Sequence, residues 1–173
     1  MALDNRTAYF EQVIWPHSRA AYHFARWLVH NDHDAEDIVQ ESLLKALGAS
    51  HTMRGADARP WLLAIVRNTA INFINRNRPA KQEEWSESDD QRTDRAPDPE
   101  GRLIAQSRSA RVRSAIAHLQ PEVREALVLR EIEGLAYKEI GFVLKIPIGT
   151  VMSRLSRARN LLAQELLAEG VEA

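Results

Sequence analysis

The stretch LQPEVREALVLREIEGLAYKEIGFVLKIPIGTVMSRLSRARNLLAQEL, residues 119–166, predicts three consecutive helices joined by tight turns. Pro121 suits the first turn of the first helix, because its missing N–H would have no hydrogen-bond partner there. Gly134 ends that helix, and a second, shorter helix is expected over residues 136–144. Pro147 clashes with a preceding helical turn, so it separates the second helix from the third. This succession is typical of a helix-turn-helix.

The third helix of this stretch has an inner and an outer face. Helical spacing places Val151, Leu155 and Leu162 on the inner face. The outer face carries small hydroxyl side chains and arginines, namely Thr150, Ser153, Arg154, Arg157 and Arg159. Hydroxyl groups hydrogen-bond to base edges in the major groove, and guanidinium groups bind guanine or phosphate. We therefore predict that this face contacts duplex DNA.

Composition limits the class of protein. The chain has 173 residues, of which 45% are hydrophobic, and this is enough for one folded domain or two small ones. Its net charge of −1 does not by itself indicate nucleic acid, but the charge is unevenly distributed. Residues 54–81 carry six basic side chains and one acidic one, whereas residues 83–100 carry eight acidic side chains and two arginines. A basic segment is therefore followed directly by an acidic one.

The sequence excludes several functional classes. It has no cysteine, which excludes disulfides, thiol catalysis and zinc–cysteine sites. The N-terminus lacks the basic and apolar segments of a signal peptide, and no apolar run is long enough to span a membrane. It has no glycine-rich phosphate loop and no activated nucleophile. We expect a cytoplasmic protein that is not an enzyme, has no cofactor, metal or small-molecule substrate, and does not insert into membranes.

The acidic segment also marks a domain boundary. Residues 79–102 combine prolines and many charges with little aliphatic content, so we expect a flexible acidic linker there. This linker separates an N-terminal unit over residues 5–78 from a C-terminal unit over residues 103–168. Hydrophobic periodicity near 3.6 residues predicts an all-α fold with two small helical domains. Trp85 in the linker is either a docking anchor or simply an exposed aromatic side chain.

The N-terminal unit is expected to contain four helices. The first two, over residues 8–15 and 18–30, form an antiparallel pair. The third spans residues 34–47, with Asp32 and Asp34 as N-cap candidates whose charge suits the positive end of the helix dipole. Its predicted core stripe is Val39, Leu43, Ala46 and Leu47.

The opposite side of this third helix has a mixed character. Positions i, i+3, i+4 and i+7 form one exposed face made of Asp37, Gln40, Glu41 and Leu44. An acidic, amide and apolar face of this kind is suited to a partner helix with a basic rim. A solvated face with a single exposed leucine explains the same spacing, and spacing alone favours that simpler interpretation.

The fourth helix, over residues 59–76, has one polar side. Its buried side is expected to hold Leu62, Ile65 or Val66, Thr69 and Phe73. Its other side carries Asn68, Asn72, Asn75 and Arg76. Asparagine weakens helices because its side chain competes for backbone hydrogen bonds, so three of them on one side require an explanation.

Unpaired nucleic acid would explain this polar side. Amide groups donate to and accept from base edges, while phosphates can be held by Arg67, Arg76 and Arg78. Trp61 and His51 can stack on unpaired bases, which contributes ~1–3 kcal/mol per base. A polar surface around a core tryptophan explains the residues equally well.

Taken together, these motifs resemble those of bacterial RNA polymerase sigma factors of the extracytoplasmic-function (ECF) class. The N-terminal motifs are DAEDIVQESLLKAL (34–47) and RPWLLAIVRNTAINFINR (59–76), and the C-terminal motif is the helix-turn-helix stretch. Their order around an acidic linker is highly specific and covers nearly the whole chain. The resemblance implies a protein that binds core RNA polymerase and directs promoter recognition, DNA melting and transcription initiation.

The resemblance implies a partner for each face. The clamp helices of the largest polymerase subunit would bind Asp37, Gln40, Glu41 and Leu44. The melted non-template strand at the −10 element would be captured by Trp61, Arg67, Asn68, Asn72, Asn75, Arg76 and Arg78. A flipped base would enter a pocket at either loop 77–81 or loop 50–57. The −35 element would be read as duplex by Thr150, Ser153, Arg154, Ser156, Arg157 and Arg159.

Some residues depart from the family pattern. Lys145 stands where the turn of the helix-turn-helix usually has glycine, so it either strains the turn or adds a phosphate contact. Gly141 replaces a common alanine, which costs ~1 kcal/mol of helix propensity. Met152 occupies a position that is often basic and Ser156 one that is often larger, which puts the −35 sequence in doubt.

Regulation and alternatives follow from the same features. We expect no appended sensory domain, so the resemblance suggests an anti-sigma factor that covers the polymerase- and DNA-binding faces.

A sigma-like decoy that only binds an anti-sigma factor would be expected to lose its DNA-contacting arginines, and here they remain. A stand-alone helix-turn-helix regulator leaves the N-terminal faces unused. A metal site at His30, Asp32, His33 and Asp34 is a weak alternative, because helix capping already explains the aspartates.

Overall fold

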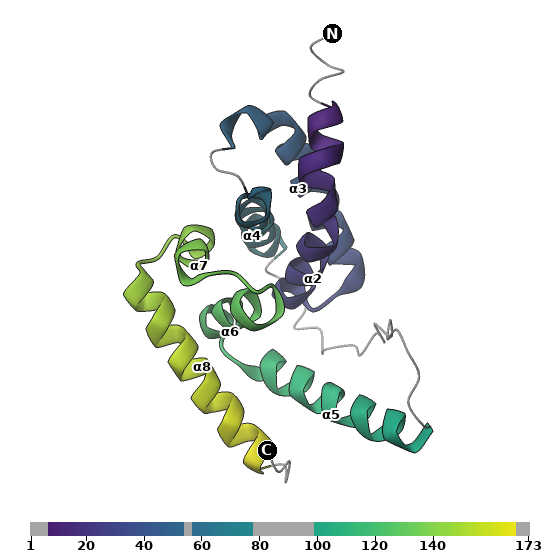
Figure 1. Cartoon of the computed structure of the whole chain (residues 1–173), viewed down its shortest axis with the longest axis vertical. Coiled ribbons are helices and arrows are strands. Elements are labelled where there is room, and N and C mark those ends of the chain that lie inside the picture. The colour runs from purple at the N-terminus through teal and green to yellow at the C-terminus, as the bar shows by residue number, and fades with distance from the viewer. Residues whose placement is uncertain (1–6, 54–56, 78–98, 169–173) are drawn as a thin grey trace.

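The computed structural model describes residues 7–53, 57–77 and 99–168, and in this part every regular element is a helix (Figure 1). The predicted all-α fold is therefore confirmed. Most of the predicted linker, residues 79–98, lies outside the described residues, as do Arg78 and Trp85. None of the helices in the described ranges is long and apolar enough to cross a lipid bilayer.

The described part of the N-terminal half contains a bundle of α-helices with short turns of π- and 3-10 helix beside them. The elements are η1 (Phe10–Ile14), η2 (Trp15–His17), α2 (Ser18–Val29), α3 (Asp32–Ala49), η3 (Ser50–Thr52) and α4 (Ala58–Arg76). Helices α2, α3 and α4 each pack against the other two. The centre of this bundle is formed by fully buried side chains, including Ile14, Phe24, Ile38, Leu62, Leu63 and Val66.

Two details of α3 differ from the prediction. The N-cap is Asn31, whose side-chain oxygen accepts a hydrogen bond from the Asp34 amide at 3.0 Å, so Asp32 and Asp34 lie in the first turn instead. Asn31 has the extended backbone that a capping residue needs, whereas Asp32 is already helical. The core stripe also includes Ile38 and Ser42, whose hydroxyl donates to the Ile38 carbonyl at 2.6 Å. Two of the predicted stripe residues, Leu43 and Leu47, are only partly buried.

The C-terminal half contains the predicted helix-turn-helix and one further helix. Its elements are α5 (Pro99–His118), α6 (Pro121–Leu127), η4 (Val128–Ile132), α7 (Tyr137–Leu144) and α8 (Ile148–Ala168). Gly134 has a φ of 66°, a left-handed conformation that glycine adopts without strain, and it follows the end of η4 as predicted. Lys145 has the same conformation, with a φ of 56°, and forms the C-cap of α7.

The buried apolar residues of this half belong to the same hydrophobic cluster as those of the N-terminal half. Fully buried side chains from η4, α7 and α8 meet there, including Leu129, Ile140, Val151 and Leu155. Arg124 of α6 is also buried, and it donates to the Ala117 carbonyl at 2.7 Å and to the Leu119 carbonyl at 3.3 Å. The arginine thereby satisfies carbonyl groups at the end of α5 that have no helical partner.

The two halves are in direct contact. Helix α4 packs against α7, and α2 touches α6 and η4 (Figure 1). Two arginines of α4 form ion pairs across this contact, Arg59 with Glu133 at 3.1 Å and Arg67 with Glu125 at 2.9 Å. We call this the closed arrangement.

Candidate polymerase and DNA interface

The outer face of α3 matches the prediction at three of its four positions. Asp37, Gln40 and Leu44 are exposed, and Leu44 has 71% of its surface in contact with solvent. Folding therefore leaves these three side chains available for a partner. The exposed leucine adds apolar surface that a partner helix would remove from water.

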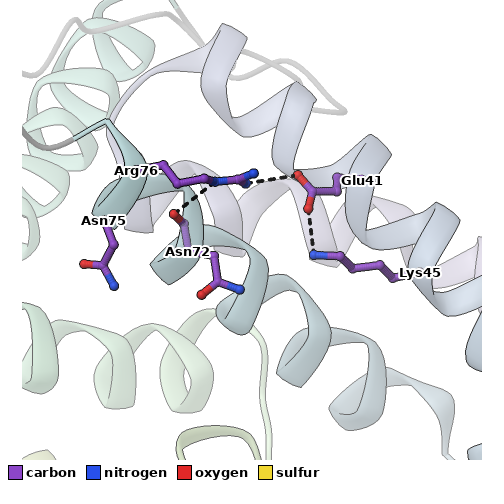
Figure 2. A pocket seen from close by; sticks show the side chains of 5 residues that line it. All are labelled: Glu41, Lys45, Asn72, Asn75 and Arg76. Carbon is purple, nitrogen blue, oxygen red and sulfur yellow. Dashed lines mark hydrogen bonds and ion pairs between the residues drawn. The ribbon is translucent and has the colours of Figure 1, made fainter.

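The fourth position, Glu41, is half-buried and bound to other residues of the same half. One oxygen of its carboxylate lies 2.7 Å from Lys45 Nζ, and the other lies 3.5 Å from an Arg76 side-chain nitrogen (Figure 2). The hydrogen bond from Lys45 is the main reason why the Glu41 pKa lies below its usual value. Glu41 therefore connects the predicted polymerase face to the predicted DNA face.

The polar side of α4 is open. Asn68, Asn72, Asn75 and Arg76 are all exposed, as the helical spacing predicts. Arg76 donates to the Asn72 carbonyl at 3.3 Å, so its guanidinium lies along the same side of the helix. Trp61 is half-buried and packs against the core of this half. The amides and one cation therefore form a continuous surface at the C-terminal half of α4.

Arg67 faces away from this surface. Its Nε donates to a Glu125 carboxylate oxygen, and both side chains are largely buried between the two halves. We predicted Arg67 as a phosphate ligand, but in the closed arrangement its charge is already paired. DNA can reach this arginine only after α4 and α6 separate.

The recognition helix α8 presents part of the predicted DNA face. Ser153, Ser156 and Arg157 are exposed, while Thr150 and Arg154 are half-buried. The Ser153 hydroxyl donates to the Thr150 carbonyl at 3.0 Å. In the closed arrangement, therefore, the hydroxyl groups of Ser153 and Ser156 remain accessible, and so do two arginines of this face, Arg157 and Arg159.

Two arginines of α8 have contacts within the C-terminal half. Arg154 donates to the Glu122 carbonyl at 3.5 Å, and Arg159 pairs with Glu131 at 2.7 Å. The hydrogen bond that Arg159 donates to the Glu131 carboxylate is the main reason why the Arg159 pKa is raised. Both arginines therefore have partners that DNA would have to replace.

The two aspartates considered as metal ligands have other contacts. Asp32 accepts hydrogen bonds from Arg26 and from the Tyr22 hydroxyl, and Asn31 caps the helix through the Asp34 amide. Burial lowers the pKa of His30 to about 4, and the charge of Arg124 acts in the same direction. Arg124 belongs to the C-terminal half, so His30 lies near the contact between the halves.

Four residues in these contacts were missed by the sequence reasoning. Lys45 follows Glu41 by four residues, a spacing typical of a helical ion pair, so this signal was available. Arg59 pairs with Glu133, which lies 74 positions further along the chain, and Glu125 pairs with Arg67, 58 positions before it. No local sequence pattern indicates partners at such distances. Glu133 is held by Arg59, although burial raises its pKa.

Comparison with known families gives two matches. Residues 14–79 match the family described as sigma-70 region 2, and residues 109–162 match sigma-70 region 4. The first range includes α2, α3 and α4, and the second includes α6, α7 and most of α8. The two matches therefore coincide with the two halves and lie on either side of the acidic segment.

Relatives match across both halves. The ECF RNA polymerase sigma factor SigE of Mycolicibacterium smegmatis is 31% identical over 94% of this chain, which spans 63% of that protein's length. The RNA polymerase sigma-H factor of Pseudomonas aeruginosa is 37% identical over 80% of the chain and 76% of its own length.

Solved structures share this fold over most of the chain. One is the sigma factor RpoE of Bartonella quintana in complex with the anti-sigma factor NepR, with a TM-score of 0.74 and 26% identity over 91% of this chain and 96% of that one. Another is CnrH in complex with the cytosolic domain of CnrY, with a TM-score of 0.68 and 25% identity over 96% and 93% of the two chains.

Proposed function

The chain belongs to the extracytoplasmic-function class of RNA polymerase sigma factors, and we propose that it binds core RNA polymerase and directs promoter recognition, DNA melting and transcription initiation. It acts in the cytoplasm as an initiation factor and not as an enzyme. The observation that carries this proposal is the presence, in one chain, of an exposed acidic and apolar face on α3, an exposed asparagine face on α4 and a recognition helix.

For polymerase binding we propose the outer face of α3. Asp37 and Gln40 supply acceptors for a basic partner helix, and Leu44 supplies apolar surface. Glu41 lies at the edge of this face and shares its charge with α4. The exposure of Leu44 supports this assignment, because a leucine with 71% of its surface in contact with solvent is available to a partner.

For promoter binding we propose a division between the two halves. Helix α4 captures the unpaired non-template strand at the −10 element through its asparagine face and Arg76, with Arg67 joining after the halves separate. The flipped base enters a pocket at loop 77–81 or at loop 50–57. Helix α8 reads the −35 element as duplex DNA, with Ser153, Ser156 and Arg157 already exposed.

We also propose that an anti-sigma factor keeps the chain in the closed arrangement. The RpoE structure is a complex with the anti-sigma factor NepR, the CnrH structure is a complex with the cytosolic domain of CnrY, and both overlap this chain over both halves. In the closed arrangement, Glu125 and Glu133 form ion pairs with two arginines of α4 that lie close to the proposed promoter-binding surface. Simultaneous reading of both promoter elements therefore requires the two halves to separate.

Reconstituted transcription tests the proposed function. The chain is mixed with core bacterial RNA polymerase and fragmented genomic DNA, and the 5′ ends of the transcripts are sequenced. New, discrete start sites that share two upstream motifs are the expected result. Polymerase binding without new starts would favour a decoy for an anti-sigma factor, and no polymerase binding would favour a stand-alone regulator.

The polymerase face has a matched pair of variants. Leu44→Ala removes an exposed leucine from α3, and Leu167→Ala removes one from α8 with a similar exposure, 67% against 71%. Leu44→Ala should weaken binding to core polymerase about tenfold, or ~1.4 kcal/mol, with unchanged thermal stability. Leu167→Ala should leave the affinity unchanged. Equal affinities of the two variants for core polymerase would refute the assignment.

A further inference from the structure

The polar hollow between α3 and α4 combines cations from both helices. It measures about 480 Å³ and is lined by Glu41, Lys45, Asn72, Asn75 and Arg76 (Figure 2). Lys45 and Glu41 extend from α3, while the asparagines and Arg76 extend from α4. Apart from Glu41, every lining side chain is exposed. The hollow therefore continues the asparagine face of α4 onto the neighbouring helix.

We propose that this hollow binds one backbone phosphate of the unpaired promoter strand between Lys45 and Arg76, with Glu41 as the counter-ion that the phosphate replaces. The inference rests on the proposed function and adds Lys45 to the DNA-binding residues. It also gives Glu41 a role different from that of a direct polymerase contact.

The position of Glu41 indicates how an anion fits this hollow. Its carboxylate bridges the two cations, with one oxygen 2.7 Å from Lys45 Nζ and the other 3.5 Å from Arg76. A phosphate group also offers two oxygens to two donors, so it can take the same bridging position. The Glu41 side chain is 39% exposed and reaches the outer face of α3, so it has room to turn away.

Charge and hydrogen-bonding groups favour nucleic acid in this position. When Glu41 turns outward, two positive charges face the hollow beside the amides of Asn72 and Asn75. Amide groups hydrogen-bond to base edges or sugars, and the cations bind the phosphate between them. A phosphate of the strand that lies along α4 is therefore held from two sides, by α3 and by α4.

Lys45 also has a contact with a structural role. Its Nζ lies 3.2 Å from the hydroxyl of Thr69, a fully buried residue of α4. A lysine that only braces the two helices would affect folding stability and would leave the salt dependence of DNA binding unchanged. Salt dependence therefore separates the two roles, because each phosphate contact on a single strand contributes about 0.7 to the slope of log K against log salt.

The experiment uses the complex with core polymerase at saturating concentration and a labelled single-stranded −10 oligonucleotide. Its sequence is taken from the start sites found by reconstituted transcription. Lys45→Gln should weaken binding about three- to tenfold at low salt and reduce the salt slope by about 0.7. Lys45→Arg should preserve both, because it keeps the charge. Arg19→Gln, which removes an exposed positive charge from α2, is the matched control and should change neither.

Two further measurements locate the contact. Oligonucleotides with a single uncharged methylphosphonate linkage should show one position at which the wild-type chain loses affinity and Lys45→Gln loses none. Glu41→Gln, measured at saturating polymerase, should bind the strand about two- to fivefold more tightly, because the competing carboxylate charge is gone.

The possible failures are distinguishable. If the wild-type chain does not form a complex with core polymerase that binds the strand, the proposed function fails. If it does, an unchanged salt slope in Lys45→Gln, or equal sensitivity of Lys45→Gln and wild type at every linkage, overturns the phosphate site. Weaker strand binding by Glu41→Gln would overturn its role as counter-ion. Free inorganic phosphate at millimolar concentration should not compete, and competition would assign the hollow to a free anion.

Discussion

The two halves of the molecule differ in how far the closed arrangement covers the helix that we propose as the DNA-binding helix of each half. Helix α8 keeps Ser153, Ser156 and Arg157 exposed. Helix α4 instead faces the other half, and both Arg59 and Arg67 pair with glutamates of that half. The C-terminal half therefore covers part of the surface that we propose for promoter binding on the N-terminal half and leaves most of its own proposed surface open.

This asymmetry has a physical basis in the charges at the contact. The N-terminal half contributes arginines, and the C-terminal half contributes carboxylates, which take positions that the phosphates of DNA could otherwise occupy near α4. Glu133 is the most deeply buried of them, with 4% of its side chain exposed. A carboxylate removed from water in this way is stabilised only while its arginine stays in place.

The strongest test of the comparison is therefore to remove that arginine. Arg59→Ala leaves Glu133 buried without its partner, and we expect the closed arrangement to lose about 2–4 kcal/mol relative to the separated halves. Because the chain has no cysteine, Glu36→Cys and Gln164→Cys give two unique labelling sites on exposed positions of α3 and α8. Energy transfer between the labels should fall in the variant.

Arg19→Ala is the control for this measurement, because it removes an exposed arginine of α2 that belongs to neither of the two ion pairs between the halves. Its energy transfer should equal that of the labelled wild type. A distance distribution in Arg59→Ala that matches the control would show that apolar packing of α4 on α7 holds the halves together without the ion pair.

A variant of Arg157 tests the exposed face of α8 in the C-terminal half. Arg157→Ala should weaken binding to a −35 duplex by about 1–3 kcal/mol if the guanidinium reads a guanine, and the loss should disappear on a sequence in which that base is changed. Binding titrations with both duplexes measure this difference. An equal loss on both would show that Arg157 contacts a phosphate instead.

Acid should affect the contact between the halves through His30. The unfolded chain binds a proton near pH 6.5, but burial and the nearby Arg124 hold the pKa of His30 at about 4 in the folded chain. Protons therefore favour the unfolded state in this window, and stability that is fully present at pH 7 is lost as the pH falls towards 4. We expect a loss of about 1–2 kcal/mol by pH 4.5, less than the whole shift implies because the imidazole keeps some contact with water.

Denaturant unfolding at a series of pH values measures this loss. His30 has a left-handed backbone with a φ of 57°, which asparagine tolerates, so His30→Asn is the suitable control. The stability of this variant should change less between pH 7 and pH 4.5 than that of the wild type. The same pH dependence in both would assign the effect to other groups.

Most of the local structure could be predicted from the sequence, because local structure leaves periodic signals. The predicted antiparallel pair over residues 8–15 and 18–30 was wrong, because η1, η2 and α2 follow one another without a loop between them. The spacing of apolar residues along α4, the break at Gly134 and the asparagine face all match the structure. The predicted N-cap of α3 was wrong. Asn31, Asp32 and Asp34 are all good capping residues within four positions, and the backbone geometry selects among them.

The contacts between elements left weaker signals or none. The pairing of Glu41 with Lys45 follows helical spacing, but its extension to Arg76 requires α3 and α4 to be packed together. The ion pairs of Arg59 and Arg67 join residues from opposite ends of the chain, and neither composition nor periodicity predicts them. Positions could therefore be assigned to faces from sequence, whereas their partners required the fold.

The smallest expected effect concerns the turn before the recognition helix. Lys145 adopts a left-handed conformation, which costs a residue with a Cβ atom roughly 1 kcal/mol relative to glycine. Lys145→Gly should stabilise the chain by about 0.5–1 kcal/mol in denaturant unfolding, because greater freedom of the unfolded chain offsets part of the relief. Gly141→Ala should do the opposite, because a Cβ atom there would lie 3.0 Å from the Ile146 carbonyl oxygen. If Lys145→Gly is more stable but binds the −35 duplex more weakly, Lys145 contributes a phosphate contact that explains why a strained lysine stands at this turn.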